Sequence, residues 1–359
     1  MKKMFVTKTF LPPQEEYDAI LKEAWDSNWI TNRGVLVKRL EEQLKEHLKV
    51  PNILLTTNGT LPLQIAIKAL DLKGEIITTP FSYVATTSAI VWEGCTPVFV
   101  DIHPEYLTID ETKIEAAITS KTSAILATHV YGNPCAVEEI EVIAKKHNLR
   151  VIYDAAHCFG VTYKGKSIFQ YGDVSTCSFH ATKIFHTGEG GALFCNDEEL
   201  FNKLNYMHNF GHDGPERFHG LGINAKMSEL QAAMGLAVLP YVSKIKEDRK
   251  KVFTYYKENL DQNIVKFLKF RTHTSHNHSY FPVVFEDEKM LNTVMKNLNN
   301  IQIFTRRYFY PSLNSLNYVE KKYMPTAQEV SSKVLCLPCS SDLDFSMLGK
   351  LIEIINSLR

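Results

Sequence analysis

The chain has 359 residues, of which 45% are hydrophobic and 22% charged, as is typical of a globular protein with a sizeable core. Its 40 basic residues balance its 40 acidic residues, so the formal net charge is zero and no overall field attracts nucleic acid or anionic lipid. The opening residues lack an apolar run of signal-peptide length, and no stretch reaches the roughly 18 apolar residues of a membrane span. We therefore expect a cytoplasmic protein that binds neither nucleic acid nor membrane.

Short apolar runs alternate with helix-like segments from residue 50 to residue 200. Strand-like runs occupy 53–57, 75–80, 96–101, 123–130, 150–157 and 173–180, and helical patterns such as 60–70, 81–94 and 136–148 lie between them. This alternation predicts βαβ units and a mostly parallel sheet. Because such sheets bind ligands beyond the carboxyl ends of their strands, functional residues are expected directly after the strands.

A different pattern begins near Pro240, which is expected to end one helix and open a charged helix at 241–260. Shorter strand-like runs and a terminal helix at 345–358 follow. We therefore expect an α/β protein with a large domain over residues 1–240 and a smaller C-terminal α/β domain over residues 241–359.

Two candidate ligand positions follow strands of the expected sheet. Asp154 ends the run RVIYD, where a carboxylate can bind a ligand, although Asp is also a favoured helix N-cap residue. Gly59 and Thr60 lie between a strand and a helix, where glycine and free helix amides can accept a phosphate, although a plain strand–helix turn looks the same. The Gly59 turn and the glycine cluster at 188–191 match neither GxGxxG nor the P-loop pattern, which disfavours a nucleotide-dependent oxidoreductase.

Lys183 lies in the stretch SFHATKIFHTGEGG, between the hydroxyl residues Ser178 and Thr182 and a cluster of glycines. Hydroxyl groups can bind phosphate oxygens, and glycines let a chain approach a bound ring closely. A lysine in such a place can form a Schiff base with a carbonyl cofactor. Spacing alone would favour an exposed lysine, because lysines are mostly exposed.

Five motifs in order resemble the DegT/StrS family of sugar aminotransferases, which share the fold of aspartate aminotransferase. These motifs are NGTLPLQIAIKAL, TTPFSYVATTSAIVWEGCTPVFVDI, YDAAHCFG, SFHATKIFHTGEGGA and GINAKMSELQAAMG. The resemblance implies a type I pyridoxal 5′-phosphate (PLP) fold, with PLP as cofactor and Lys183 as its covalent attachment point. It also implies that Asp154 pairs with the pyridine nitrogen.

The resemblance implies further contacts for PLP and a shared active site. Its other cofactor-binding positions are Gly59, Thr60, Tyr83, His157, Ser178 and Asn224. Asn224 corresponds to an asparagine that reaches the phosphate from the neighbouring subunit, which implies a homodimer. Candidate substrate contacts are Thr31, Lys226, Arg306, Arg307 and Tyr310. For the last three, a solvated basic edge is the alternative interpretation.

Within the family, the intact Lys183 favours transamination over the dehydration that some relatives perform with a histidine at this position. The motifs are most similar to the branch that transfers an amino group from L-glutamate to the C4 ketone of dTDP-4-keto-6-deoxyglucose, for bacterial O-antigen biosynthesis. A C3-keto sugar aminotransferase and a non-catalytic PLP-binding regulator remain alternatives. The sequence alone does not identify the keto position.

Two other patterns favour structural interpretations. His273, His276 and His278 lie close together without acidic or thiol partners nearby, so we expect a polar loop and no metal site. Trp25 and Trp29 have helical i, i+4 spacing, so we expect both to pack on one helix face.

The seven cysteines, an odd count, argue against a disulfide framework.

Overall fold

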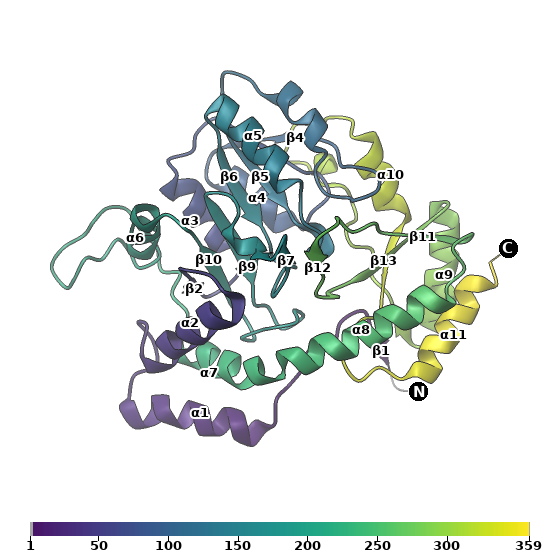
Figure 1. Cartoon of the computed structure of the whole chain (residues 1–359), viewed down its shortest axis with the longest axis horizontal. Coiled ribbons are helices and arrows are strands. Elements are labelled where there is room, and N and C mark those ends of the chain that lie inside the picture. The colour runs from purple at the N-terminus through teal and green to yellow at the C-terminus, as the bar shows by residue number, and fades with distance from the viewer. Residues whose placement is uncertain (1–2, 359) are drawn as a thin grey trace.

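A computed structural model describes residues 3–358, and within them a seven-stranded sheet forms the centre of the larger part of the molecule (Figure 1). Its order is β2-β10-β9-β6-β5-β3-β4. Its strands are β2 (Leu54–Thr56), β3 (Glu75–Thr78), β4 (Thr96–Phe99), β5 (Thr122–Thr128), β6 (Arg150–Asp154), β9 (Val174–Ser178) and β10 (Gly191–Phe194). Only β10 in this sheet runs antiparallel to its neighbours, which confirms the expected mostly parallel sheet.

Helices cover both faces of this sheet, because successive strand residues bury opposite faces. Leu55 and Ile77 belong to one core with α2 and α7, whereas Leu54 and Ile76 belong to a second core with α3 and α4. The helices of the first 240 residues are α1 (Gln14–Ser27), α2 (Val35–Leu48), α3 (Leu61–Ala69), α4 (Val84–Trp92), α5 (Val137–His147), α6 (Glu198–Met207) and α7 (Glu229–Val238). The sheet is therefore a buried layer whose ligands must approach along its edge or ends.

A smaller sheet of order β11-β13-β15 forms a separate layer in the C-terminal part (Figure 1). Its strands are β11 (Val265–Phe267), β13 (Phe281–Phe285) and β15 (Val334–Leu337). The accompanying helices are α8 (Val242–Asn259), α9 (Glu288–Asn300), α10 (Pro325–Lys333) and α11 (Phe345–Asn356). A short 3₁₀ turn at Leu239–Tyr241, which contains Pro240, separates α7 from α8. We propose that the boundary between the large domain and the C-terminal domain lies at residue 240.

The N-terminal segment packs with the C-terminal part. Strand β1 (Met4–Phe5) pairs in parallel with β14 (Ile303–Phe304), and Met4 lies in the same core as α9 and α11. Sequence patterns did not indicate this pairing, because two-residue strands carry no readable periodicity. A further small ribbon joins β7 (Thr162–Tyr163), β8 (Lys166–Ser167) and β12 (Thr274–Ser275).

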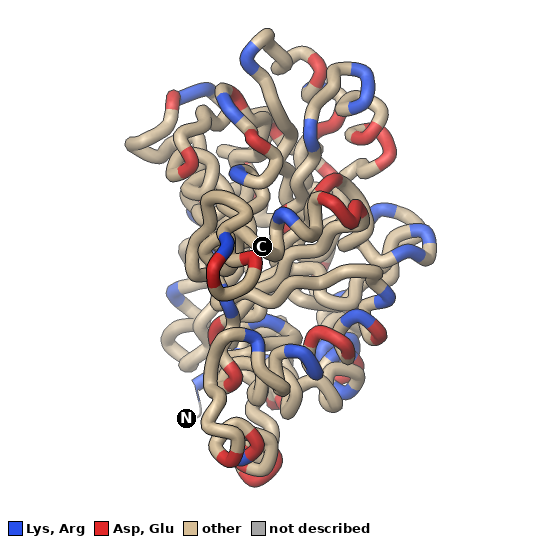
Figure 2. Tube along the Cα trace, turned by 90° about the vertical axis from the view of Figure 1, so that its left-hand side faces the viewer, with Lys and Arg blue, Asp and Glu red and all other residues tan. Residues whose placement is uncertain are grey.

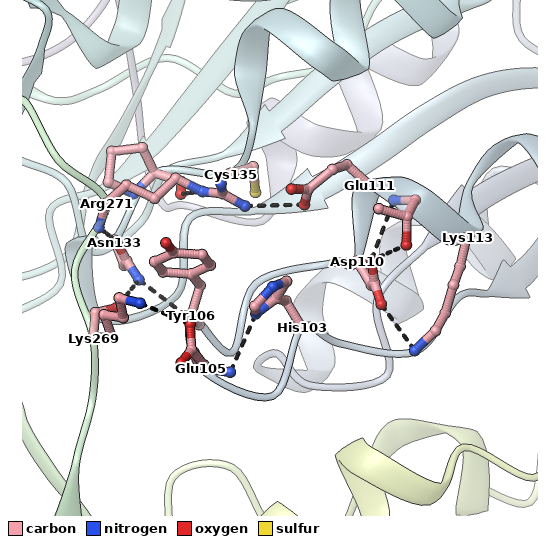
Figure 3. Close-up of polar contacts among 12 residues, drawn as sticks. His103, Glu105, Tyr106, Asp110, Glu111, Lys113, Asn133, Cys135, Lys269 and Arg271 are labelled. Atoms are coloured by element: carbon pink, nitrogen blue, oxygen red, sulfur yellow. Dashed lines mark hydrogen bonds and ion pairs between the residues drawn. The ribbon is translucent and has the colours of Figure 1, made fainter.

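A polar cluster fastens the loop after β4 to the segment that leads from β11 to β12 (Figure 3). The Arg271 guanidinium donates to Glu111 Oε2 at 2.9 Å and lies 4.4 Å from the centre of the Tyr106 ring. Asn133 Nδ2 donates to the carbonyl oxygens of Tyr106 and Lys269, each at 3.0 Å. Because this segment continues into β13, these contacts hold the C-terminal part against the large sheet.

The expectation for Trp25 and Trp29 is wrong. Helix α1 ends at Ser27, and Asn28 adopts a left-handed conformation, so Trp29 lies beyond the helix. Both indole rings are exposed.

Over the face drawn in Figure 2, acidic and basic residues are interspersed rather than gathered by sign.

Candidate active site

The carboxyl ends of the central strands form one side of a cavity of about 380 Å³. Asp154 ends β6 and Ser178 ends β9, and these two strands are parallel neighbours. Gly59 and Thr60 follow β2, and antiparallel β10 brings Gly191 to the same edge, beside Ser178. The residues that line the cavity are Asn58, Gly59, Thr60, Leu63, Tyr83, Ala85, Asp154, Ala156, His157, Ser178, His180, Thr182, Lys183, Glu189, Arg306, Tyr308 and Phe309.

The structure therefore brings together seven of the eight predicted cofactor-binding residues. Gly59, Thr60, Tyr83, Asp154, His157, Ser178 and Lys183 all line this cavity. Their positions span 125 residues of the sequence, and they meet because the parallel strands end at one edge.

Asp154 is buried at the floor of this cavity. Its Oδ2 accepts a hydrogen bond from Thr86 Oγ1 at 2.7 Å, and its Oδ1 accepts one from the Ala156 amide at 3.1 Å. Burial raises the pKa of the carboxyl group above its ordinary value, while these hydrogen bonds and the Lys183 amine oppose that shift. A carboxylate in this place is suited to bind a protonated ring nitrogen, because such a partner would compensate its buried charge. Asp154 is thus not a helix N-cap, because no helix begins directly after it.

Lys183 extends from a loop that backbone hydrogen bonds close tightly. The Phe179 amide donates to the Gly190 carbonyl at 2.8 Å, and the Ala181 amide donates to the Gly188 carbonyl at 2.7 Å. A Cβ atom at Gly190 would lie 1.9 Å from Thr187 Oγ1, so only glycine fits there. The glycine cluster therefore shapes the loop that presents Lys183.

The amine of Lys183 is poised to act as a base. Its Nζ lies 3.5 Å from the hydroxyl oxygen of Tyr280, and no carboxylate of residues 3–358 forms an ion pair with it. Burial lowers the pKa of this amine below that of an ordinary lysine. A larger fraction of the amine is then neutral near pH 7, as covalent attachment to an aldehyde requires.

His157 is held as a neutral donor beside the cavity. The Tyr131 amide donates to its Nδ1 at 3.0 Å, and burial lowers the pKa of the ring well below its ordinary value. Because Nδ1 accepts a hydrogen bond, the neutral ring carries its proton on Nε2. The ring packs parallel to Phe309, with centroids 5.8 Å apart. Nε2 can therefore donate to an oxygen substituent of a bound ring.

Gly59, Thr60 and Ser178 form a concave surface that fits a phosphate group. A Cβ atom at Gly59 would lie 2.7 Å from Ser178 Cβ and 3.0 Å from its Oγ, so a side chain there would fill the space above Ser178. The amides of Thr60 and Leu61 already donate to Asn58 Oδ1, each at 2.9 Å. The remaining donors are the Gly59 amide and the hydroxyl groups of Thr60 and Ser178. This set of neutral donors beside a helix N-terminus suits the phosphate of PLP.

Asn224 and Lys226 do not line this chain's cavity. Lys226 Nζ donates to Asn224 Oδ1 at 2.7 Å and lies 4.8 Å from the centre of the Phe210 ring. The segment runs beside the end of β2, where the Thr57 amide donates to the Ala225 carbonyl at 2.8 Å. Asn224 itself is exposed.

Thr31, Arg307 and Tyr310 also lie outside the lining, and the Arg307 side chain has partners within the C-terminal part. The Arg307 guanidinium donates to Glu288 Oε1 at 2.7 Å and to the Ser332 carbonyl at 3.0 Å. Its neighbour Arg306 lines the cavity instead and stacks on Tyr308, 4.1 Å from the ring centre. Adjacent loop residues often point apart, so the run TRRYFYP could not distinguish the two arginines.

Sequence reasoning also missed Thr86, Tyr280 and Tyr308, which contact Asp154, Lys183 and Arg306 respectively. Thr86 lies in a quoted motif, but its hydroxyl group looks like any helix threonine until the fold places it against Asp154. Tyr280 and Tyr308 come from the C-terminal part, which no local pattern connects to the strand ends.

Within residues 3–358, no group of three or more His, Cys, Asp or Glu side chains is arranged to hold a metal ion. Among the helices of the same range, none is both long and apolar enough to cross a membrane.

Known proteins share both the sequence and the fold. The family model of the DegT/DnrJ/EryC1/StrS aminotransferases matches residues 13–356. The chain is 42% identical to a dTDP-4-amino-4,6-dideoxy-D-glucose transaminase of Shigella dysenteriae, with 100% of both chains covered. An Escherichia coli protein of the same name is 38% identical, with 98% of this chain and 97% of the relative covered.

A solved structure gives the same picture. The crystal structure of DesI in the presence of its TDP-sugar product superposes with a TM-score of 0.94 at 32% identity, covering 99% of this chain and 93% of that one. The expected type I PLP fold is thereby confirmed. The cavity suits PLP in its donors, its buried carboxylate and its accessible lysine. The chain belongs to the DegT/DnrJ/EryC1/StrS aminotransferase family and is a PLP-dependent aminotransferase.

Proposed function

We propose that this enzyme transfers the amino group of L-glutamate to the C4 ketone of dTDP-4-keto-6-deoxyglucose. The names of the Shigella dysenteriae and Escherichia coli relatives, which cover nearly the whole chain, support the sugar product. The product would serve bacterial O-antigen biosynthesis. We also propose that the enzyme works in the cytoplasm, which the seven free cysteines support, because disulfides are rare in reducing compartments.

One observation carries the reaction type. The amine of Lys183 and the buried carboxylate of Asp154 lie in the same cavity, together with the concave surface formed by Gly59, Thr60 and Ser178. When bound, PLP supplies an aldehyde that takes up the amino group and a ring that accepts negative charge. The roles of the protein residues follow from where their atoms lie.

Lys183 is proposed as the proton carrier of both half-reactions. With its pKa lowered by burial, its amine removes the proton from Cα of glutamate in the first half. In the second half, the ammonium group returns a proton to C4 of the sugar. Tyr280, 3.5 Å away, limits where Nζ can move.

Asp154 and His157 are proposed to orient and polarise the cofactor ring. The Asp154 carboxylate keeps a proton on the ring nitrogen, since a buried negative charge favours a cation beside it. His157 Nε2 donates to the oxygen substituent of the ring, because its Nδ1 is occupied by the Tyr131 amide. Tyr83, which is 53% exposed at the cavity, is proposed to stack on the outer ring face.

The nucleotide sugar is proposed to bind on the exposed side of the cavity, near Arg306. We further propose a homodimer in which Asn224 and Lys226 of one subunit reach the cofactor phosphate and the diphosphate in the other. Exposed apolar side chains near residue 224 and near residue 30 support an interface. These two exposed segments lie close together, because the Glu229 amide donates to the Ile30 carbonyl at 3.0 Å. Thr31 and Tyr310 stay candidate substrate contacts.

A turnover assay tests the proposed function. The purified enzyme should convert dTDP-4-keto-6-deoxyglucose and L-glutamate to an amino sugar and 2-oxoglutarate, and NMR should place the nitrogen on C4. Turnover of the 3-keto isomer alone would favour the C3 alternative. Absence of turnover with both isomers, despite bound PLP, would favour a non-catalytic regulator.

A further inference from the structure

We propose that the hydroxyl groups of Thr86, Ser82 and Thr128 form a positioning relay, which holds the Asp154 side chain ionised and aimed into the cavity. This inference deepens the proposed function and rests on it, because it assumes that Asp154 faces the ring nitrogen of PLP. None of the three residues lines the cavity, so each would act through Asp154 rather than on the reacting atoms.

The relay is continuous. Thr128 Oγ1 donates to Ser82 Oγ at 3.0 Å, Ser82 Oγ lies 2.7 Å from Thr86 Oγ1, and Thr86 Oγ1 donates to Asp154 Oδ2 at 2.7 Å. All four side chains are buried, so water does not compete for these bonds.

The direction of the relay follows from counting protons. Each hydroxyl group has one proton to donate. The Thr86 proton is directed to the carboxylate, so the proton between Ser82 and Thr86 must come from Ser82. Thr128 in turn donates to Ser82. All three dipoles therefore point toward Asp154 and favour its charged form.

The central sheet brings the relay together. Thr128 is the last residue of β5, paired in register with Asp154 at the end of β6, while Ser82 lies in the turn before α4 and Thr86 in its first turn. The relay thus connects two strand ends to the start of one helix. No local sequence spacing would place these hydroxyl groups in contact.

The relay matters because the carboxyl group of Asp154 is buried. Burial raises its pKa, whereas the Thr86 hydrogen bond, the Ala156 amide and the Lys183 amine oppose that shift. The other titratable neighbours stay uncharged near neutral pH, because burial lowers the pKa of His157 and raises the pKa of Cys158 and Cys177. Thr86 and Lys183 are therefore the main side chains that keep Asp154 ionised.

The adjacent residue Thr87 provides a matched control. It lies on the same helix and is equally buried, but its Oγ1 has no hydrogen-bond partner among the described residues. Thr86→Val and Thr87→Val remove the same atom from neighbouring buried positions. Only the first change takes a hydrogen bond from Asp154, so a general packing defect would affect both variants alike.

The experiment compares full-length variants reconstituted with PLP. The absorbance of the bound cofactor and kcat/KM are both measured from pH 5 to pH 9, and PLP affinity is measured by titrating the apo enzyme. In Thr86→Val, the acid limb of both profiles should move up by about 1 to 2 pH units, as expected for one lost hydrogen bond to a charged group. Loss of the hydroxyl group raises the pKa of Asp154, so the carboxylate becomes protonated at a higher pH.

The other variants should follow the order of the relay. Thr86→Ser should restore the wild-type profiles, Thr87→Val should leave them unchanged, and Ser82→Ala should cause a smaller shift in the same direction as Thr86→Val. If Thr86→Val does not fold, the Ser82→Ala shift decides. Identical profiles for Thr86→Val and Thr87→Val, or no shift in Ser82→Ala when it alone can be measured, would overturn the relay.

Asp154→Asn separates failure of the relay from failure of the proposed function. If Asp154→Asn loses turnover and the pH-dependent absorbance while Thr86→Val behaves like wild type, Asp154 acts as proposed but needs no relay. If Asp154→Asn keeps normal turnover and absorbance, the proposed role of Asp154 is wrong, and the relay is overturned with it.

Discussion

The two sides of the cavity differ in how completely a single chain builds them. On the side of the strand ends, Asp154 and His157 are buried, and neighbouring groups hold both through hydrogen bonds. On the outer side, Tyr83 and Arg306 are exposed, and no carboxylate of residues 3–358 forms an ion pair with the Arg306 guanidinium. The inner side is thus preorganised for one fixed ligand, while the outer side has groups available for an anion or a second subunit.

The surface next to the outer side supports this contrast. Large apolar side chains that would normally be buried are exposed in the segments near Asn224 and Lys226, namely Trp29, Ile30, Val35, Phe210, Phe218, Leu221 and Ile223. Such a concentration is typical of a protein–protein interface. The groups proposed for the chemistry are thus buried and held by hydrogen bonds within one chain, whereas the groups proposed for substrate recognition are exposed.

The largest expected effect comes from the inner side. Lys183→Ala should reduce turnover by at least about 1,000-fold, because the proton carrier and the covalent attachment point are both lost. Borohydride reduction of the wild-type enzyme should fix the cofactor to Lys183, which peptide mass spectrometry can locate. The exposed Lys73 provides the control, since Lys73→Ala should behave like wild type. Reduced cofactor found on another lysine would contradict the assignment.

The second prediction tests whether the outer side needs a partner. Inactive Lys183→Ala subunits are mixed with inactive Asn224→Ala/Lys226→Ala subunits under conditions of subunit exchange. Each heterodimer should contain one intact site out of two, so activity should rise to roughly a quarter of the wild-type value at equal mixing. Mass spectrometry must confirm the exchange. If exchange occurs without recovery, these residues act within their own chain or do not contact the ligand.

Gly59→Ala should weaken PLP binding by roughly 10- to 100-fold, because the new methyl group would lie 2.7 Å from Ser178 Cβ in the proposed phosphate site. Titration of the apo enzyme with PLP measures this effect. Gly349→Ala is the control, since its added Cβ would meet only Tyr255 at an ordinary 3.6 Å, far from the cavity. Unchanged PLP affinity in Gly59→Ala would place the phosphate elsewhere.

The smallest effects should separate the two adjacent arginines. Arg306→Ala should raise KM for the nucleotide sugar by about tenfold with little change in melting temperature, because its cation faces the cavity. Arg307→Ala should instead lower the melting temperature slightly, since its guanidinium bonds Glu288 and Ser332. Steady-state kinetics and thermal melts measure both. The reverse pattern would show that Arg307, and not Arg306, is the arginine that contacts the substrate.

Much of the inner side could be predicted from the sequence. The alternation of strand-like and helix-like segments predicted the mostly parallel sheet, and the rule that ligands bind beyond strand ends pointed to Asp154 and Gly59. These signals are readable because strand and helix periods are local, and because glycine and hydroxyl residues mark turns. The family resemblance added Lys183, His157 and Ser178 as members of one site.

Only the tertiary structure decided which side chains of the loops and of the C-terminal part reach the cavity. Arg306 rather than Arg307 faces it, Thr86 rather than Thr87 contacts Asp154, and β1 pairs with a strand some 300 residues away. The direction of a loop side chain depends on contacts between distant segments, and no periodicity records such contacts. Local patterns therefore determined the strand-end half of the site, while long-range packing determined the rest.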